Sequence, residues 1–335
     1  MRTSIFLSVA LFVLGALATL SPAQSSSNVG PRLRGIELYN QKNYREAANV
    51  LKQAVSQDKN DADAWYYLGL ALLEDPKARK EASRAFETAT KLRPNFAAAH
   101  AGFAYLLLLR NKETEAAHEA RAALALDPKI PNAHYILGVT QLKTSKAQAL
   151  ENAEAEIKLQ PEFGAAYLLK SLALVLFSGD VMLSEEDESS ESREVRYRQA
   201  ADTLEKFLQL SPRDPYRDTW TRQLESLRFF ASPKSGEARL VYSGRQVTTK
   251  AKVLSKPEPG YTETARAAGI TGKVVLRCVF TAEGEVKHFL IVKPLAYGLT
   301  EQAIKAARRI KFIPATADGH PVSMYIQLEY NFSLY

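Results

Sequence analysis

The chain has 335 residues, 46% of them hydrophobic, a single cysteine and a formal net charge of +7. The lone Cys278 excludes an internal disulfide, and we expect a buried, unreactive thiol. The charge excess lies in residues 234–335, which hold 15 Lys and Arg against 8 Asp and Glu, so the first 233 residues are neutral overall. No base-stacking or groove-reading motif accompanies the basic residues, and nucleic acid is therefore not an expected partner.

The N-terminus has the pattern of an export signal. Arg2 precedes an apolar run over residues 5–20, and Ser21 and Ala23 place small side chains ahead of a possible cut before Gln24. Residues 1–23 are therefore predicted to be a secretory signal peptide, with the mature chain in the periplasm or cell envelope. The alternative, an uncleaved inner-membrane anchor, is disfavoured because a helix of these sixteen residues rises about 24 Å, less than the roughly 30 Å hydrocarbon core.

Residues 30–230 carry an internal repeat. Pro94, Pro128 and Pro161 are 34 and 33 residues apart. Small and large residues recur between them at fixed positions, first as Trp65, Leu68, Gly69, Ala82, Phe86 and Ala89. The pattern resembles the tetratricopeptide repeat, in which small residues allow two helices to cross closely and Pro ends the second helix. We predict an all-α solenoid of antiparallel helix pairs over residues 30–230, closed by a capping helix at 216–230.

The tetratricopeptide resemblance implies a concave groove lined by the first helices of successive repeats. The residues that it places there are Asp63, Tyr66, Tyr105, Asn132, Tyr135 and Leu142. A groove lined by aromatic residues suits an extended or helical peptide from a partner protein. In the alternative, the same tyrosines pack between repeats. Ile36 and Leu70 stand where chaperone-tail-binding repeats carry Asn, so a chaperone C-terminal carboxylate is not an expected ligand.

Two segments interrupt or follow the repeats. The insert at 178–195 is rich in Asp and Glu and poor in apolar residues, which is typical of a solvated loop. A calcium site is not expected there because the alternating Asp and Gly pattern of a calcium loop is absent. Residues 231–250 are predicted to be a linker, in which Leu240, Val241 and Tyr242 can form a strand that covers the following domain.

Residues 251–335 predict a small α+β domain. Thr262 is placed to cap a short helix that ends at Gly269. The next two segments alternate apolar and polar side chains and predict a hairpin, and a stretch with helical spacing follows it. A long alternating strand reaches the end of the chain. The predicted ranges are 262–268, 273–281, 286–292, 299–310 and 323–335, and they give helix, strand, strand, helix and strand with a three-stranded antiparallel sheet.

Short motifs stand in one order along this domain. They are Pro257-Glu-Pro-Gly-Tyr261, Gly269-Ile-Thr-Gly272, Phe312-Ile-Pro-Ala315 and Asp318-Gly-His-Pro-Val322. This order resembles the C-terminal domain of TonB, the periplasmic protein that grips outer-membrane transporters. The resemblance implies that the last strand pairs with an extended transporter segment, near the outward residues Tyr325, Gln327, Glu329 and Asn331. In the alternatives this strand pairs in a homodimer or is covered by the preceding linker.

Catalytic and metal-binding patterns are missing from the sequence. The five histidines show no His-Glu-x-x-His spacing, and neither a nucleophile elbow nor a phosphate-binding loop occurs. We therefore expect no enzyme activity, no cofactor and no metal. The expected function is a cell-envelope adaptor, with a tetratricopeptide scaffold for one protein partner and a TonB-like domain for another. The alternative is an energy transducer of TonB-dependent transport, anchored by an uncleaved N-terminal helix whose apolar run over residues 5–20 contains no ionisable side chain.

Overall fold

The computed structural model describes residues 30–180, 190–232 and 240–334, apart from 76, 111, 143, 268 and 296. The predicted signal peptide and the centre of the acidic insert lie outside these residues. The chain divides into two compact units. The first takes in the described residues up to 144 together with 158–160, and the second takes in 145–157 and the described residues from 161 onward.

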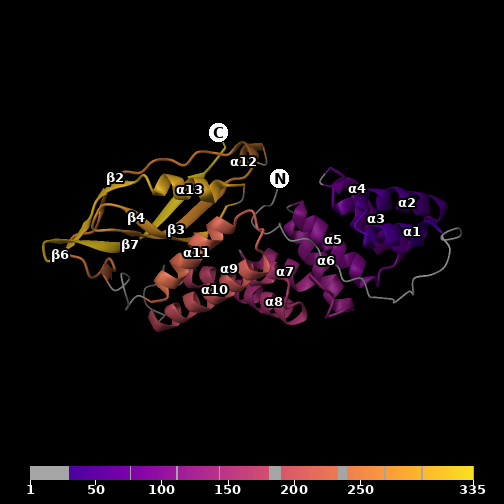
Figure 1. Ribbon diagram of the computed structural model, residues 1–335, viewed down its shortest axis with the longest axis horizontal. Coiled ribbons are helices and arrows are strands. Elements are labelled where there is room, and N and C mark those ends of the chain that lie inside the picture. The colour runs from indigo at the N-terminus through magenta and orange to yellow at the C-terminus, as the bar shows by residue number, and fades with distance from the viewer. Residues whose placement is uncertain are drawn as a thin grey trace. The chain divides into compact units, whose positions relative to one another are not determined.

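The first unit is built from helices, each of which packs against the next along the chain. Its helices are α1 (Pro31–Asn40), α2 (Tyr44–Gln57), α3 (Ala62–Leu73), α4 (Arg79–Leu92), α5 (Ala97–Leu109), α6 (Glu113–Leu126) and α7 (Ala133–Gln141). They form the predicted pairs α1 with α2, α3 with α4, and α5 with α6, shown in indigo to magenta in Figure 1. Each pair covers the apolar side of its neighbour, which is how a solenoid of repeats is stabilised.

The contact of α3, α4 and α5 shows why the repeat needs glycine at fixed positions. The Phe86 ring of α4 is fully buried between Gly69 of α3 and Gly102 of α5. A Cβ atom added at Gly69 would lie 2.9 Å from this ring, and one added at Gly102 would lie 2.7 Å from it. Both distances are below van der Waals contact, so only glycine permits this packing. The predicted tetratricopeptide fold is confirmed.

The second unit starts with the last helices of the repeat region. They are α8 (Lys146–Leu159), α9 (Gly164–Asp180), α10 (Ser190–Leu210) and α11 (Arg217–Phe230). Helices α9 and α10 form a long pair, in which the Ser171 hydroxyl donates a hydrogen bond of 2.8 Å to the carbonyl of Ala200. Helix α11 packs on α10 at the predicted place of the capping helix.

A five-stranded sheet completes the second unit. Its strands are β1 (Val241–Tyr242), β3 (Gly272–Phe280), β4 (Val286–Lys293), β6 (Ala315–Ala317) and β7 (His320–Phe332), in the order β1-β7-β3-β4 with β6 also on β7. Strand β3 pairs antiparallel with β4 and β7, as predicted. Strand β1 runs parallel to β7, so the sheet is mixed, and the prediction of a purely antiparallel sheet is corrected. The extra strand comes from the segment predicted to be a linker.

A second, two-stranded sheet pairs β2 (Lys252–Ser255) with β5 (Lys311–Ile313). It lies outside the order of the main sheet. Most of its side chains are exposed, including those of Val253, Leu254 and Ile313, and Phe312 alone is buried. The small sheet therefore adds little to the core and mainly holds the chain ahead of α12 in place.

One face of the main sheet, called here the inner face, packs on α12 (Glu263–Ala267) and α13 (Leu299–Ala307). The predicted alternation is confirmed, since Val274, Leu276, Cys278 and Phe280 all enter this core. Burial raises the pKa of the Cys278 thiol. The Thr262 hydroxyl accepts the N–H of residue 265 at 3.2 Å, which is the expected helix cap.

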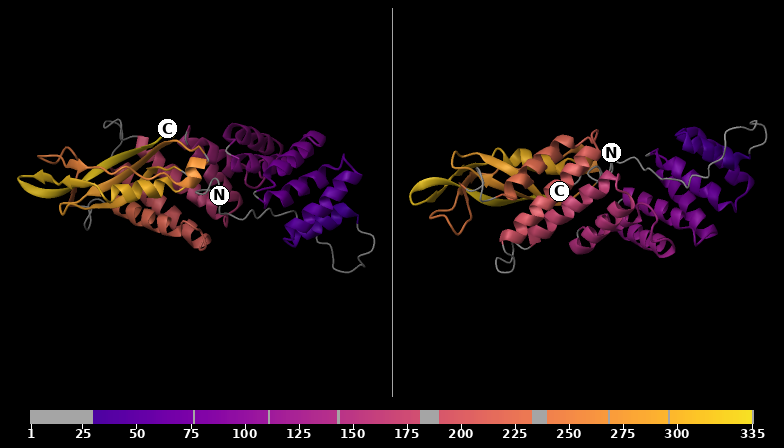
Figure 2. Two further views of the ribbon diagram at one scale, coloured as in Figure 1. Left: turned by 90° about the horizontal axis from the view of Figure 1, so that it is seen from above. Right: turned by 60° about the horizontal axis from the view of Figure 1, so that its bottom comes forward.

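The other face of the sheet, called here the outer face, packs on α9, α10 and α11. Figure 1 shows these helices and α13 on opposite sides of the strands, and Figure 2 shows the coral helices against the yellow strands from two more directions. Leu290 of β4 is fully buried in one cluster with Leu204, Trp220 and Phe230. The last helices of the repeat region and the sheet therefore share a hydrophobic core within one unit.

Candidate functional site

The free edge of β7 is the first candidate surface. One side of this strand pairs with β3 from Met324 to Phe332. On the other side, called here the outer edge, β1 pairs only with Ser323 and Met324. From Tyr325 to Phe332, no described strand pairs with the outer edge. Such an edge offers main-chain donors and acceptors to another extended segment.

The predicted residues of β7 differ in exposure. Gln327, Glu329 and Asn331 are exposed. Tyr325 is half-buried, because its ring lies 5.5 Å from that of Phe230 on α11. Burial in this contact raises the pKa of Tyr325. Tyr325 thus belongs to the packing between α11 and the outer face, while the other three side chains lie in solvent.

The segment that follows β2 lies against the outer edge without forming a ladder. The ammonium group of Lys256 donates a hydrogen bond of 2.6 Å to the main-chain carbonyl of Glu329 and lies 4.6 Å from the centre of the Tyr330 ring. Pro257 and Pro259 follow, and proline carries no N–H to donate to a neighbouring strand. A side-chain contact therefore takes the place of a strand here.

The Lys256 contact also tells which main-chain groups face outward. In an antiparallel strand the N–H and C=O of one residue point to the same side. Because the carbonyl of Glu329 is bound from the outer edge, its N–H faces that edge too. Residues two positions away, Gln327 and Asn331, follow the same alternation. The outer edge therefore presents the main-chain groups of three exposed residues.

The Glu329 carboxylate is held separately from its carbonyl. It pairs with the Lys273 ammonium group of β3 at 2.9 Å. This hydrogen bond and the charge of Lys273 lower the pKa of Glu329. Both side chains are largely exposed, so the pair is screened by solvent and contributes little to stability. The charge of the Glu329 carboxylate is balanced by the Lys273 ammonium group.

Polar contacts join the outer face to α10 and α11. The buried Arg277 of β3 donates a hydrogen bond to the hydroxyl of Tyr197 on α10. The N–H of Ile291 donates to the Gln223 side chain of α11 at 3.0 Å. Sequence reasoning missed this interface. The sequence does contain a pattern that indicates it. The run Val274–Phe280 is apolar at six of seven positions, which is typical of a strand buried on both faces.

Aromatic stacking supports the same interface. The rings of Phe229 on α11 and His288 on β4 lie 3.7 Å apart and nearly parallel, with 9° between their planes. His288 adopts a φ of 53°, in the left-handed region that non-glycine residues rarely occupy. This backbone conformation accompanies an irregular pairing of β3 with β4 between Arg277 and Val279. The stacked pair thus marks the place where β4 adapts to α11.

Four of the six predicted groove residues are buried in the first unit. Tyr66, Asn132, Tyr135 and Leu142 are all less than one-tenth exposed. The Tyr66 ring packs 4.9 Å from that of Phe96, and burial raises its pKa. The side-chain oxygen of Asn132 accepts a hydrogen bond of 3.3 Å from the Gln160 amide. In this structure these four side chains fill the space between helices.

The other two predicted groove residues are partly exposed. The Asp63 carboxylate accepts two hydrogen bonds from the Arg93 guanidinium, at 3.0 and 2.7 Å, and is thereby neutralised. Burial raises the pKa of Tyr105 to about 12. Asp63 therefore has a partner within the chain, and only part of the Tyr105 ring reaches the surface.

A group of partly exposed tyrosines lies nearby and was missed from the sequence. Tyr39 of α1 has ring-centroid distances of 5.5 Å to Tyr44 of α2 and 5.9 Å to Tyr67 of α3. All three rings are neither buried nor fully exposed. The adjacent pair Tyr66-Tyr67 could have indicated this group. In a helix the side chain of Tyr67 points about 100° away from that of Tyr66 and so reaches a different surface.

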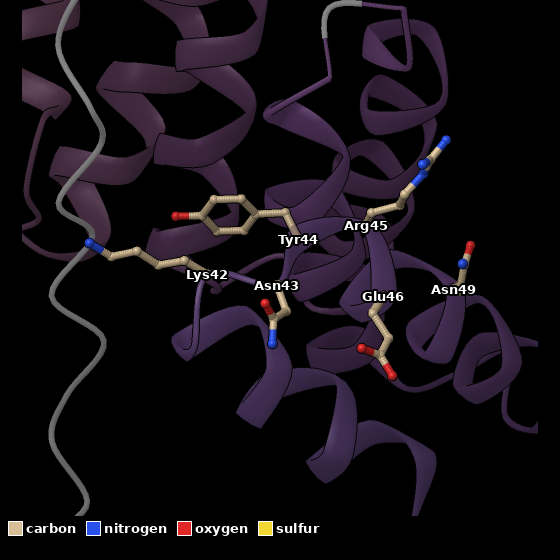
Figure 3. Close-up of a pocket in the computed structure, with 6 residues that line it drawn as sticks. All are labelled: Lys42, Asn43, Tyr44, Arg45, Glu46 and Asn49. Carbon is tan, nitrogen blue, oxygen red and sulfur yellow. The ribbon is translucent and has the colours of Figure 1, made fainter.

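A shallow pocket of about 480 Å³ opens at the start of α2. Figure 3 shows the residues that line it, which are Lys42, Asn43, Tyr44, Arg45, Glu46 and Asn49. The lining is polar and carries charges of both signs. Over the described ranges, no group of three potential metal ligands lies close enough together to hold a metal ion. No described helix has the length and apolar character needed to cross a bilayer.

Two family models match the chain. Residues 257–334 match the Gram-negative bacterial TonB protein C-terminal domain. Residues 32–78 match a tetratricopeptide repeat. Both matches agree with the resemblances seen in the sequence and with the two folds described above. No match was found among curated protein sequences.

Several solved structures are similar to this chain over part of its length. MamA is 18% identical, with 56% of this chain and 97% of that chain covered and a TM-score of 0.42. MamA from residue 41 of Desulfovibrio magneticus RS-1 is 21% identical, with 55% and 95% covered and a TM-score of 0.41. YrrB, a TPR protein with an unusual peptide-binding site, is 16% identical, with 57% and 90% covered and a TM-score of 0.41.

Proposed function

We propose that this protein is a non-enzymatic adaptor of the cell envelope. Its tetratricopeptide solenoid recruits one protein partner, and its TonB-like domain binds a second, an outer-membrane transporter or another envelope protein, by strand addition. The observation that carries the proposal is the outer edge of β7, which no described strand covers from Tyr325 to Phe332. The signal-like N-terminus and the TonB family match support a place in the envelope.

Strand addition at this edge requires the segment around Lys256 to move. An incoming strand hydrogen-bonds to outward main-chain groups, and one of these, the Glu329 carbonyl, is held by the Lys256 ammonium group. The ammonium group of Lys256 is exposed and readily hydrated, so its release costs little. The incoming strand offers main-chain donors that Pro257 and Pro259 lack. The partner therefore replaces one side-chain contact by a ladder of main-chain hydrogen bonds.

The shared core of the second unit gives the adaptor a mechanical link. Leu290 and Arg277 of the sheet are buried against α10 and α11, with the Tyr197 hydroxyl and the Gln223 side chain as polar partners. A pull on β7 is passed through β3 to these contacts. The TonB-like domain is thus attached to the last helices of the repeat region by packing as well as by the chain itself.

Capture of an outer-membrane protein by the full chain tests this function. Replacing Gln327 by Pro removes an N–H that faces the outer edge and leaves the hydrogen bonds to β3 in place. We expect the Gln327→Pro variant to lose capture from solubilised outer membranes, because an incoming strand cannot bond at residue 327. Captured protein is identified by mass spectrometry.

The matched control is Gln327→Ala, which loses the same side chain and keeps the N–H. It should capture the partner as the parent chain does, and circular dichroism should show both variants folded. Equal capture by the folded Pro variant and the Ala variant would assign binding to another surface.

A further inference from the structure

The small sheet of β2 and β5 exposes apolar side chains to solvent. Over the described residues, nine large apolar side chains are well exposed, and three of these nine lie on the seven residues of this sheet. They are Val253, Leu254 and Ile313, with exposed fractions of 43%, 61% and 51%. Single exposed apolar residues are ordinary on protein surfaces, whereas three on one short element indicate a contact surface.

The register of the small sheet places cations beside these apolar side chains. Lys252 pairs with Ile313, and cross-strand partners lie on the same face. Lys311 shares that face because it is two positions from Ile313 in β5. Phe312 points the opposite way, into the core of the inner face, and Figure 1 shows β2 on the α13 side of the main strands. One face of the small sheet therefore presents two ammonium groups and an apolar side chain to solvent.

The two chain segments that build the small sheet are strongly basic. Residues 245–257 contain four Lys and Arg, residues 302–317 contain four more, and neither segment contains Asp or Glu. The side chains of Lys252, Lys305, Arg309 and Lys311 are exposed. No carboxylate of the described ranges forms an ion pair with any of these four. Their charge is therefore available to an external anion.

Acidic residues around the small sheet do not cancel this charge. Glu258 and Asp318 border the two basic segments, and two carboxylates against eight cations leave the surface positive. Other nearby carboxylates of the main sheet already have ammonium partners, at 2.9 and 2.7 Å. These ion pairs are Glu329 with Lys273 and Glu285 with Lys287.

The small sheet is poorly suited to a protein partner. The pairing of β2 with β5 shifts register between Val253 and Ser255, which is a β-bulge, and β2 also carries Lys252. Lysines and bulges on an edge strand prevent pairing with a further strand. Three apolar side chains also cover far less than the roughly 800 Å² that each partner buries in a stable protein interface. A lipid surface requires neither a strand edge nor so large an area.

We propose that the small sheet binds the surface of an anionic phospholipid bilayer. Cations are attracted to anionic headgroups, and a few apolar side chains enter the boundary between headgroups and acyl chains. Lys252 and Lys311 supply the charge at this surface, and Leu254 and Ile313 supply the apolar contact. This membrane contact is separate from the proposed adaptor function, because it involves no protein partner.

The test uses a chain that begins at Gln24, because the apolar run over residues 5–20 would itself enter a bilayer. This chain contains every residue that the structure describes. The probes are vesicles of phosphatidylcholine alone and vesicles that also contain phosphatidylglycerol, and binding is measured by cosedimentation. We expect binding to the vesicles with phosphatidylglycerol only, and weaker binding when salt is added.

Two double variants remove the charge and the apolar contact in turn. Lys252→Gln/Lys311→Gln should weaken binding to the anionic vesicles about 20-fold, because each cation near an anionic membrane contributes a factor of about five. Leu254→Thr/Ile313→Thr should weaken it about ten-fold, because the apolar side chains no longer enter the bilayer. All four side chains are exposed, so the unfolding temperature should stay the same.

Matched controls change the same kinds of side chain elsewhere. Lys59→Gln/Arg222→Gln lowers the net charge equally, from two exposed positions outside the small sheet. Leu33→Thr/Leu240→Thr removes two leucines that are 52% and 60% exposed. Both controls should bind the anionic vesicles as the parent chain does. A control that loses as much binding as its matched variant, or a parent chain that binds both kinds of vesicle equally, would overturn the proposal.

A second measurement locates the contact directly. Leu254→Cys is labelled with a polarity-sensitive dye, which the buried Cys278 does not take up in the folded chain. The dye emission should shift to the blue on addition of the anionic vesicles, while the same dye on Arg222→Cys should not respond. A dye at residue 254 that stays in water while the chain is bound to vesicles would refute insertion of the small sheet. Vesicle binding unchanged in Leu254→Thr/Ile313→Thr, with loss of a captured outer-membrane protein, would assign the surface to a protein instead.

Discussion

The two faces of the main sheet are both buried, but by different chemistry. The inner face meets α12 and α13 through apolar side chains such as Leu276 and Phe280. The outer face meets α10 and α11 through Leu290 and also through polar contacts, the Arg277 bond to Tyr197 and the Ile291 bond to Gln223. Apolar packing is non-directional, whereas a buried hydrogen bond requires one geometry.

This difference assigns separate tasks to the two faces. The inner face supplies a core that belongs to the TonB-like domain alone. The outer face fixes the orientation of that domain on the last helices of the repeat region, because the Arg277–Tyr197 and Ile291–Gln223 hydrogen bonds each require one geometry. The outer face is therefore the side from which the helices hold the sheet, and no described strand pairs with the outer edge of β7 from Tyr325 to Phe332.

Separation of the domain from α9–α11 should have the largest effect. A fragment of residues 240–335 exposes Val275, Val279, Leu290 and Val292, which are buried in the full chain. We expect this fragment to bind a hydrophobic dye and to aggregate, while a fragment of residues 145–335 unfolds cooperatively. Thermal unfolding of both fragments is the measurement. An isolated 240–335 domain with the stability of the larger fragment would show that the outer face needs no cover.

Loss of a large ring from the inner face comes next. Phe280 is fully buried and stacks 4.1 Å from Phe312, so Phe280→Ala should cost about 3–5 kcal/mol of unfolding free energy. Urea unfolding followed by alkylation of Cys278 reports this directly, because the thiol becomes reactive only when the inner face opens. The control is Phe289→Ala at a partly buried position, which should lower the unfolding free energy clearly less than Phe280→Ala does. Equal losses would contradict the assignment of Phe280 to the centre of this core.

Removal of one hydroxyl should weaken the outer face to a smaller extent. Tyr197→Phe keeps the ring and takes one partner from the buried Arg277, which should cost about 1–3 kcal/mol. The partly exposed Tyr216, changed to Phe, is the control and should change stability by less than about 0.5 kcal/mol. A Tyr197→Phe chain as stable as the parent would show that the polar contact does not hold the domain in place.

The smallest effect is expected at the outer edge itself. Lys256→Ala frees the Glu329 carbonyl and should tighten partner binding about two- to five-fold with no measurable change in unfolding temperature. Lys252→Ala removes an exposed charge of the same segment without touching β7 and serves as the control. Weaker binding by the Lys256 variant would mean that this side chain contacts the partner instead of occupying its place.

Local patterns in the sequence predicted most of the fold. Alternation over β3 identified the inner face, and the spacing of glycine and proline identified the repeats, because both signals arise between residues close in the chain. The outer face depends on contacts between distant residues, such as Tyr197 and Arg277, which are 80 positions apart. A local sequence pattern does not predict which helix will pack on a given strand.

The groove residues show a second limit. The tetratricopeptide register placed Tyr66 in the groove, and the structure buries Tyr66 and leaves its neighbour Tyr67 partly exposed. A shift of one residue turns a side chain by about 100° around a helix, enough to exchange surface for core.

Hydrogen exchange at the edge of β7 tests strand addition most directly. In the free chain the amides of Gln327, Glu329 and Asn331 face the outer edge and should exchange fast, while those of Leu328 and Tyr330 are bonded to β3 and should exchange slowly. On binding of the captured partner, the first three should become protected and the last two should stay protected. Binding that leaves the exchange of residues 327, 329 and 331 unchanged would contradict strand addition at this edge.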